Sequence, residues 1–194
     1  MRKLPFVFAA LAAASLALSP RASSAQVFTP TYMAPRPSND VGIYFDNIGD
    51  FGLEGIIRRH YVGNDLGLRV GVVGGDASAL MVGGELRSPL SLQTAPLDLA
   101  LTAGVQAIFG DYDRIGFQGG LSIGHTFVTP GLTITPYIHP RLAFTDDVND
   151  DFNADVFADV GADFALAPNL VIRVGVPLDD KGGSNFGIGL AWHQ

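Results

Sequence analysis

The sequence predicts an all-β protein, an up-and-down antiparallel β-barrel of about ten strands joined by short turns. From residue 41 to residue 193, apolar side chains alternate with small or charged ones, which is the two-residue period of a β-strand. Turn-forming residues divide this stretch into consecutive segments. Because the connections are short, each strand is expected to pair with the one before it, as in a meander.

The first residues have the pattern of an export signal. Two basic residues precede an apolar run from Leu4 to Leu18, and the small residues Ser23 to Ala25 follow it. This pattern predicts a signal peptide over residues 1–25, used by the Sec pathway and cleaved before Gln26. A membrane anchor is the less favoured interpretation, because the run is shorter than the roughly 20 apolar residues that a spanning helix needs.

Residues 26–40 differ in composition from the rest of the chain. Pro30, Pro35 and Pro37 interrupt a polar stretch, so we predict a Pro-rich linker that serves as a spacer without a core of its own. The predicted organisation is therefore a signal peptide over 1–25, a linker over 26–40 and one β-barrel domain over 41–194. The chain contains no cysteine, which excludes a disulfide framework.

Turn signals divide the barrel domain into ten predicted strands. An eight-stranded barrel, with the weak first hairpin outside the wall or plugging it, is the alternative, since bacterial single-chain barrels have even strand numbers from 8 upward. The predicted strands are 41–47, 51–60, 65–73, 78–88, 97–109, 114–128, 132–145, 152–166, 169–177 and 185–193.

The predicted turns alternate between acidic and uncharged. In an up-and-down barrel, alternate turns lie at the same end, so one rim is expected to be acidic and the other neutral. If both ends of the wall lie at the neutral rim, the number of strands must be even, and ten fits. The odd turns carry Asp50, Asp76, Asp111, Asp113, Asp146, Asp147, Asp150, Asp151, Asp179, Asp180 and Lys181, whereas the even turns 61–64, 89–96, 129–131 and 167–168 carry no charge.

One face of the predicted sheet is apolar and almost free of charge. Its only charged residue is Arg59, at a strand end where the long side chain can reach a lipid headgroup. An Arg or Lys at mid-membrane on a lipid-facing position costs roughly 2 to 4 kcal/mol, so this exclusion of charge is typical of a lipid-facing wall. Aromatic residues near both rims are predicted to form membrane-interface girdles: Phe45, Phe51, Tyr61, Phe109, Phe127, Phe144, Phe152, Phe164, Phe186 and Trp192.

The opposite face combines glycine with a balanced set of charges. Enclosed charges must be paired and hydrogen-bonded, and arginine forks onto carboxylates in a way that lysine cannot. A water-exposed face would use lysine freely, yet Lys181 is the only lysine beyond the signal peptide. We therefore predict an ionic lattice in the lumen, made of Glu54, Arg58, Arg69, Glu85, Arg87, Asp98, Arg114, Arg141, Asp155, Asp159, Asp163 and Arg173.

The exported, glycine-rich and alternating sequence over residues 41–193 resembles the small bacterial outer-membrane β-barrel proteins. The resemblance implies insertion into the outer membrane by the barrel-assembly machinery, with outer-membrane lipid as the surrounding partner. Such proteins often end on an aromatic residue, whereas Trp192 is followed here by two more residues. Pro136 and Pro140 also depart from the pattern, because each removes a hydrogen-bond donor from a strand.

These features predict a structural or weakly permeable outer-membrane barrel. A narrow pore for small polar solutes or ions is the first alternative, and a soluble lipocalin-like binding barrel is the second. No catalytic, phosphate-binding or cofactor-binding motif occurs, so neither an enzyme nor a cofactor is expected. The net charge of −7 disfavours nucleic acid as a partner.

The acidic loop between the seventh and eighth predicted strands is a weak metal candidate. Asp147, Asn149 and Asp151 supply oxygen ligands at alternate positions, like the start of a calcium loop. The glycine and the bidentate glutamate of such a loop are missing, since Phe152 and Ala158 stand at their positions. We therefore predict no specific metal site, and treat divalent cations gathered by the acidic loops as a looser hypothesis.

Overall fold

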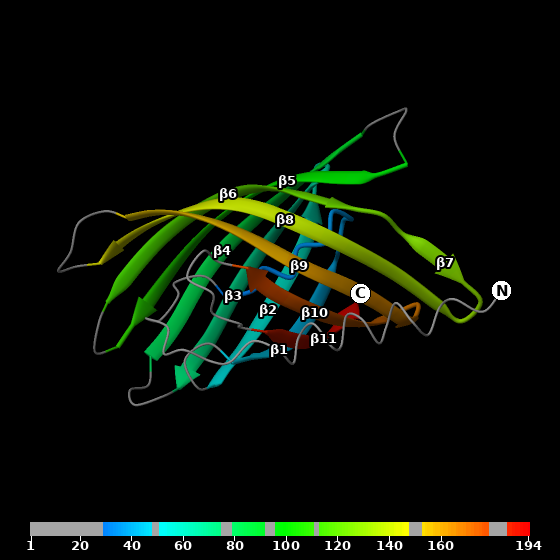
Figure 1. Cartoon of the computed structure of the whole chain (residues 1–194). Helices are drawn as coiled ribbons and strands as arrows, with labels where there is room; N and C mark the ends of the chain where they lie inside the picture. Colours follow the sequence, from blue (N-terminus) through cyan, green and yellow to red (C-terminus); the bar gives the residue numbers. More distant parts are fainter. Residues whose placement is uncertain are drawn as a thin grey trace.

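The computed structural model describes residues 29–47, 51–74, 79–91, 96–110, 113–147, 153–178 and 186–194. These residues form antiparallel strands that follow one another along the chain (Figure 1). The strands are β1 (Asp40–Asp46), β2 (Phe51–Tyr61), β3 (Asn64–Gly74), β4 (Ala79–Leu90), β5 (Asp98–Phe109), β6 (Arg114–Gly124), β7 (Phe127–Thr129), β8 (Leu132–Asp147), β9 (Asn153–Ala167), β10 (Leu170–Leu178) and β11 (Gly187–His193). Within these residues no helix has the length and apolar character needed to cross a membrane.

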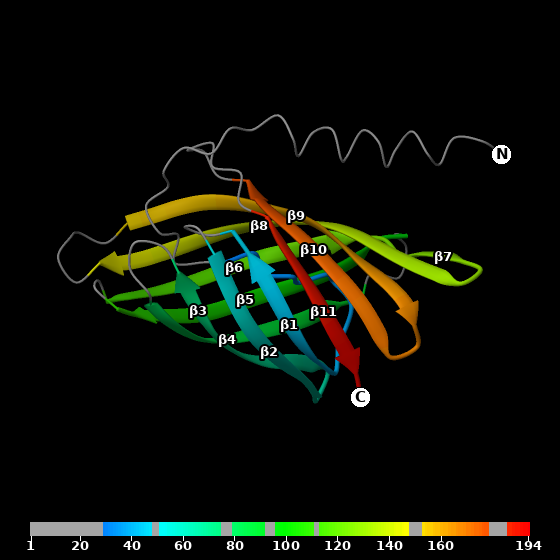
Figure 2. The same ribbon diagram turned by 90° about the horizontal axis from the view of Figure 1, so that it is seen from below.

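The strands close into a barrel of ten wall strands. β1 pairs with β11 along its whole length, from Asp40 opposite His193 to Asp46 opposite Gly187, and the two strands lie side by side in Figure 2. β6 pairs with β8, and the three-residue β7 continues along β8 where β6 ends. β6 and β7 therefore count as one wall strand, and the prediction of ten strands rather than eight is confirmed.

Both ends of the barrel wall lie at the same rim. The start of β1, the end of β11 and the turns 62–63, 130–131 and 168–169 share this end, which we call the neutral rim. At the first of these turns Val62 and Gly63 both have positive φ, as a two-residue hairpin turn requires. We call the opposite end the acidic rim. Of the residues predicted for its turns, only Asp113, Asp146 and Asp147 lie among the described residues.

The two prolines of β8 interrupt one of its two ladders. Pairing with β9 continues past both, with Pro136 opposite Ala162 and Pro140 opposite Ala158. Pairing with β6 has a gap opposite Pro140, and β6 ends next to Pro136. Because residues four apart in a strand direct their backbone groups toward the same neighbour, both missing N–H groups face β6. The two prolines therefore remove two hydrogen-bond donors from the pairing of β8 with β6 and weaken that pairing.

The apolar face of the wall points outward. Leu68 and Val156 each expose about two thirds of their surface, at 64% and 67%, although both lie within strands. The charge-free face predicted from the sequence is therefore the outside of the barrel, and Arg59 is its only charged side chain among those described. Other exposed wall residues are Ile43, Val70, Val72, Leu80, Leu101, Val105, Phe117 and Leu142.

Glycines on the inner face make room for aromatic rings in the lumen. A Cβ built at Gly42 would lie 2.6 Å from the Tyr44 ring, and one at Gly189 would also collide with that ring. Tyr44 is fully buried, and it packs with Tyr32 and Ile56. The glycine content of the inner face is thus explained by close packing of large side chains against the wall.

Gly42→Ala is expected to lower the free energy of unfolding by about 1 to 3 kcal/mol, because the added methyl group overpacks a site beside the fully buried ring of Tyr44. Gly55→Ala is the matched control, since its Cβ would point outward with no atom closer than 3.9 Å. The measurement is the temperature at which the folded form disappears in detergent. Equal transition temperatures for the two variants would contradict the packing argument.

Candidate functional site

The lumen contains an additional stretch of chain, residues 29–38, which we call the plug segment. It forms no strand, and Thr29, Thr31, Tyr32, Met33 and Ala34 are each at most 2% exposed. Figures 1 and 2 show this part of the chain, coloured blue before β1, among the strands of the wall. The proline-rich sequence predicts a spacer here. The structure differs because the polar backbone of this stretch meets hydrogen-bonding side chains inside the barrel.

Side chains of the wall hold the plug segment by its backbone carbonyl groups. Three arginines and one serine donate to four carbonyls spread along it, so the segment is held along most of its length. The bonds are Arg69 to Pro30 O at 3.2 Å, Arg58 to Thr31 O at 3.1 Å, Ser122 to Met33 O at 2.5 Å and Arg87 to Ala34 O at 2.6 Å.

The plug segment runs from the acidic half of the lumen to the neutral rim. Thr29 lies 3.4 Å from Glu54, near the start of β2. At the other end, the Ser38 N–H donates to Asp65 at 3.1 Å, near the start of β3. Between Met33 and the surrounding arginines and acids, the free volume is too small to hold a water molecule. The plug segment therefore fills the lumen on the side of β2, β3 and β4.

A first group of ion pairs joins β2, β3 and β4. Arg69 forks onto Glu54, with N–O distances of 2.7 and 3.1 Å, and Arg58 forms a close pair with Glu85. Arg69 also approaches Glu85 at 3.9 Å, so the four charges alternate in sign across three strands. All four side chains are buried, and their mutual pairing offsets the cost of removing them from water.

A second group joins β10 to its neighbour β9 and, across β11, to β1. Arg173 contacts Asp40 at 2.7 Å, Asp163 at 3.1 Å and the Tyr44 hydroxyl at 2.7 Å. The predicted linker ends at Asp40, whereas in the structure Asp40 is the first residue of β1. The side chain of Asp40 is fully buried, so this strand end is part of the lumen lattice.

A third group surrounds Asp159 on β9. Its carboxylate accepts hydrogen bonds from Arg141 at 2.9 Å and from the Thr31 hydroxyl at 2.7 Å, and His139 Nδ1 lies 3.5 Å away. His139 Nε2 lies 2.7 Å from the Thr102 hydroxyl. This order of hydroxyl, imidazole and carboxylate occurs in catalytic sites. Here Thr102, His139 and Asp159 are all buried against the plug segment and the wall, at 9% exposure or less.

Two shallow spaces lie at the neutral rim beside the plug segment. One, of about 180 Å³, is bordered by Arg36, Ser38, Thr135 and Asp163. The other, of about 660 Å³, lies between Pro37 and the β4–β5 connection. Both spaces border the end of the plug segment, at Arg36 and Pro37.

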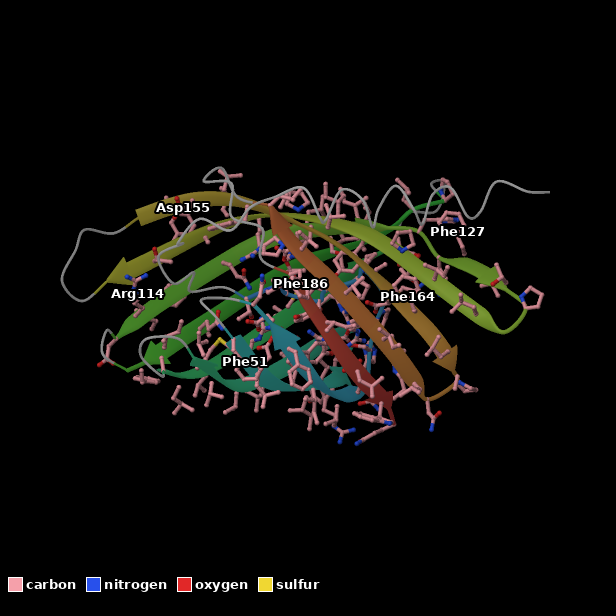
Figure 3. All side chains as sticks on the ribbon, turned by 60° about the horizontal axis from the view of Figure 1, so that its bottom comes forward. Phe51, Arg114, Phe127, Asp155, Phe164 and Phe186 are labelled. Carbon is pink, nitrogen blue, oxygen red and sulfur yellow. The ribbon has the colours of Figure 1, made fainter. Side chains whose placement is uncertain are left out.

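The structure brings most of the predicted lattice residues together and adds others. The three groups contain nine of the twelve predicted residues once Arg87, paired with Asp65 at 2.5 Å, is included with the first. Asp98 instead pairs with Arg36 at the rim, at 3.1 Å, and Arg114 and Asp155 are half-buried toward the other end (Figure 3). Asp46 and Asp65 were missed, although the two-residue alternation, extended to the strand ends, places both on the inner face.

Most of the predicted interface aromatics are exposed on the outer surface. Phe127 and Phe164 lie toward one end of the barrel in Figure 3, and Phe164 is half-buried. Phe152 lies outside the described residues. The exposed members are Phe45, Phe51, Tyr61, Phe109, Phe127, Phe144, Phe186 and Trp192.

Of the weak metal candidates, only Asp147 lies in the described part of the chain. Asp147 is the last residue of β8, whereas Asn149 and Asp151 lie outside the described residues. Elsewhere in the described ranges, no group of three His, Asp or Glu side chains has an arrangement that holds a metal ion.

Replacing Asp159 with alanine is expected to lower the free energy of unfolding by about 3 to 5 kcal/mol, because the variant buries the Arg141 guanidinium without this carboxylate. Asp98→Ala is the control. Its pair with Arg36 is 34% and 54% exposed, so that loss is expected to stay under about 1 kcal/mol. Thermal melting of both variants in detergent measures the difference, and equal losses would contradict a stabilising role for the buried lattice.

No protein-family model and no curated protein matches this sequence. Among solved structures, the KdgM porin in complex with disordered oligogalacturonate has a TM-score of 0.45 and 11% identity, covering 80% of this chain and 99% of that chain. A de novo designed transmembrane β-barrel has a TM-score of 0.41 and 18% identity, covering 82% and 98%. LpxR from Salmonella typhimurium has a TM-score of 0.43 and 11% identity, covering 89% and 79%.

Likenesses at this level carry no conclusion about this chain. The architecture of the chain rests on its own strand pairing: a closed, ten-stranded, up-and-down barrel with an apolar outside and a charged inside. This is the architecture of a small outer-membrane β-barrel.

Proposed function

We propose that this protein is an outer-membrane β-barrel with a structural role, and that its own residues 29–38 keep its lumen closed. The observation that carries the proposal is the division of side chains between the two faces of the wall. Large apolar side chains are exposed on the outside of every wall strand, whereas the described arginines and acids of the wall, apart from Arg59, point inward. Lipid is the solvent that such a surface requires, because monomeric soluble proteins rarely expose large continuous apolar surfaces.

The reversed arrangement would be needed for a soluble binding barrel. A lipocalin-like barrel encloses its apolar face around a ligand and presents charges to water. In this chain the inner face carries five buried arginines. The single described charge on the outer face, Arg59, lies two residues before the end of β2 at the neutral rim. This difference supports the membrane barrel over the soluble alternative.

A non-enzymatic role is part of the proposal. The Thr102, His139 and Asp159 arrangement is buried, and none of its members borders the spaces at the neutral rim. The Thr31 hydroxyl also occupies a position between His139 and Asp159, at 2.8 and 2.7 Å. This hydroxyl completes a hydrogen-bond network between plug and wall, which supports a structural use of these groups.

Export and membrane insertion complete the proposal. The predicted signal peptide over residues 1–25 would deliver the chain through the Sec pathway, and the barrel-assembly machinery would insert it. The neutral rim, which has the two-residue turns 62–63, 130–131 and 168–169 and both ends of the wall, would then face the periplasm, because periplasmic turns of such barrels are short.

The folded protein in detergent is expected to migrate differently in gel electrophoresis before and after heating, because a closed barrel resists unfolding by detergent until it is heated. Purified protein is compared with and without boiling. Identical mobility of the two samples would contradict the membrane barrel.

A charge introduced on the outer face tests whether lipid or water surrounds that face. Leu68→Arg is expected to destabilise the protein in lipid bilayers by roughly 2 to 4 kcal/mol, since Leu68 lies in the middle of β3 and faces outward. Val62→Arg, in the exposed turn at the neutral rim, is the control and is expected to have little effect. Unfolding in vesicles measures both, and an undisturbed Leu68→Arg variant would argue against lipid contact.

A further inference from the structure

The plug segment and the wall are structurally separate units. The wall strands pair with one another around the complete barrel without using residues 29–38. Within the described residues, no backbone-to-backbone hydrogen bond joins these residues to a strand. The segment is therefore held by side chains alone, and its departure would break no part of a β-ladder.

The arginines that hold the plug segment keep their partners if it leaves. Arg69 remains on Glu54, Arg58 remains on Glu85, and Arg87 remains on Asp65. Asp159 loses the Thr31 hydroxyl and keeps Arg141. Because no buried charge would lose its only counter-charge, the main changes would be the entry of water, the exposure of carbonyl groups and the loss of the packing that buries Tyr32 and Met33. Removal of the segment therefore avoids the large penalty of an uncompensated buried charge.

The inner face of the wall carries excess negative charge without the plug segment. Nine acids and six arginines among the described wall residues point into the lumen, a difference of three. A lumen lined in this way attracts cations and repels anions. The acids are Asp40, Asp46, Glu54, Asp65, Glu85, Asp98, Asp155, Asp159 and Asp163, and the arginines are Arg58, Arg69, Arg87, Arg114, Arg141 and Arg173.

We propose that residues 29–38 are a displaceable plug, and that the lumen they occupy is a channel that prefers small cations. The proposal deepens the proposed function, because it rests on the barrel crossing a membrane. An eight-stranded barrel is just wide enough for its own side chains. The ten strands here enclose a further extended chain, so the space released by the plug segment is continuous from the acidic half to the neutral rim.

The first experiment deletes residues 29–38 and measures conductance in planar bilayers with potassium chloride. The deletion variant is expected to show a steady conductance at least tenfold above that of the full chain, and in a salt gradient a reversal potential of the sign expected for cation permeation. A synthetic peptide with the sequence of residues 29–38 is expected to reduce this conductance. A variant that shifts on heating in gels, and is therefore folded, but does not conduct would overturn the channel.

The second experiment uses the full chain and links the plug segment to the wall by an engineered disulfide. A Cβ built at Gly175 would lie 3.2 Å from Pro30 Cβ, close to the spacing that a disulfide requires, and the chain has no cysteine of its own. The double variant Pro30→Cys, Gly175→Cys is recorded oxidised and after reduction, with each single variant as a control. Reduction is expected to produce brief openings with the unit conductance of the deletion variant, and oxidation to abolish them.

The outcomes separate the two proposals. If neither the oxidised nor the reduced form conducts, the plug segment is a permanent part of the barrel. The proposal that it can be displaced is then wrong. This result holds even if the deletion variant fails to fold. Openings that pass anions as readily as cations would overturn the stated preference. A full chain that shows no heat-dependent mobility shift would instead contradict the membrane barrel itself.

Discussion

The pairing of charges inside the barrel is the constraint on which the rest of the structure depends. Once the outer face is apolar, every charged side chain of the wall must point inward or lie at a rim. Buried there, an arginine is tolerated only beside a carboxylate, and Arg69 with Glu54 or Arg173 with Asp40 meets this requirement at 2.7 Å. The register between neighbouring strands must therefore match charge to charge, which makes the ionic lattice a determinant of strand alignment as well as of stability.

The number of strands and the plug segment are linked by the same constraint. Ten strands enclose more space than their inward side chains fill, and a water-filled space would weaken the pairing of the charges that line it. Residues 29–38 occupy this space and supply carbonyl groups to arginines that have donors to spare. The glycines of the inner face complete the fit, since they allow the rings of Tyr32 and Tyr44 to lie against the wall.

Much of this architecture follows from the sequence alone. The two-residue period separates the faces, the absence of charge identifies the lipid side, and the balance of arginines with acids predicts an ionic interior. The alternation of acidic and neutral turns favours ten strands. These properties are readable because they repeat along the chain, so an error at one position leaves the pattern intact.

The tertiary structure decided what depends on non-repeating contacts. The pairing of Arg58 with Glu85 rather than another acid requires the register between three strands, which alternation does not specify. The use of Asp40 and Asp65 as partners depends on where the strands end. Most of all, residues 29–38 have no strand period and many prolines, so the sequence by itself predicts only a spacer. Their place in the lumen is determined by carbonyl acceptors meeting arginines from β2, β3 and β4, an interaction that exists only after the barrel has closed.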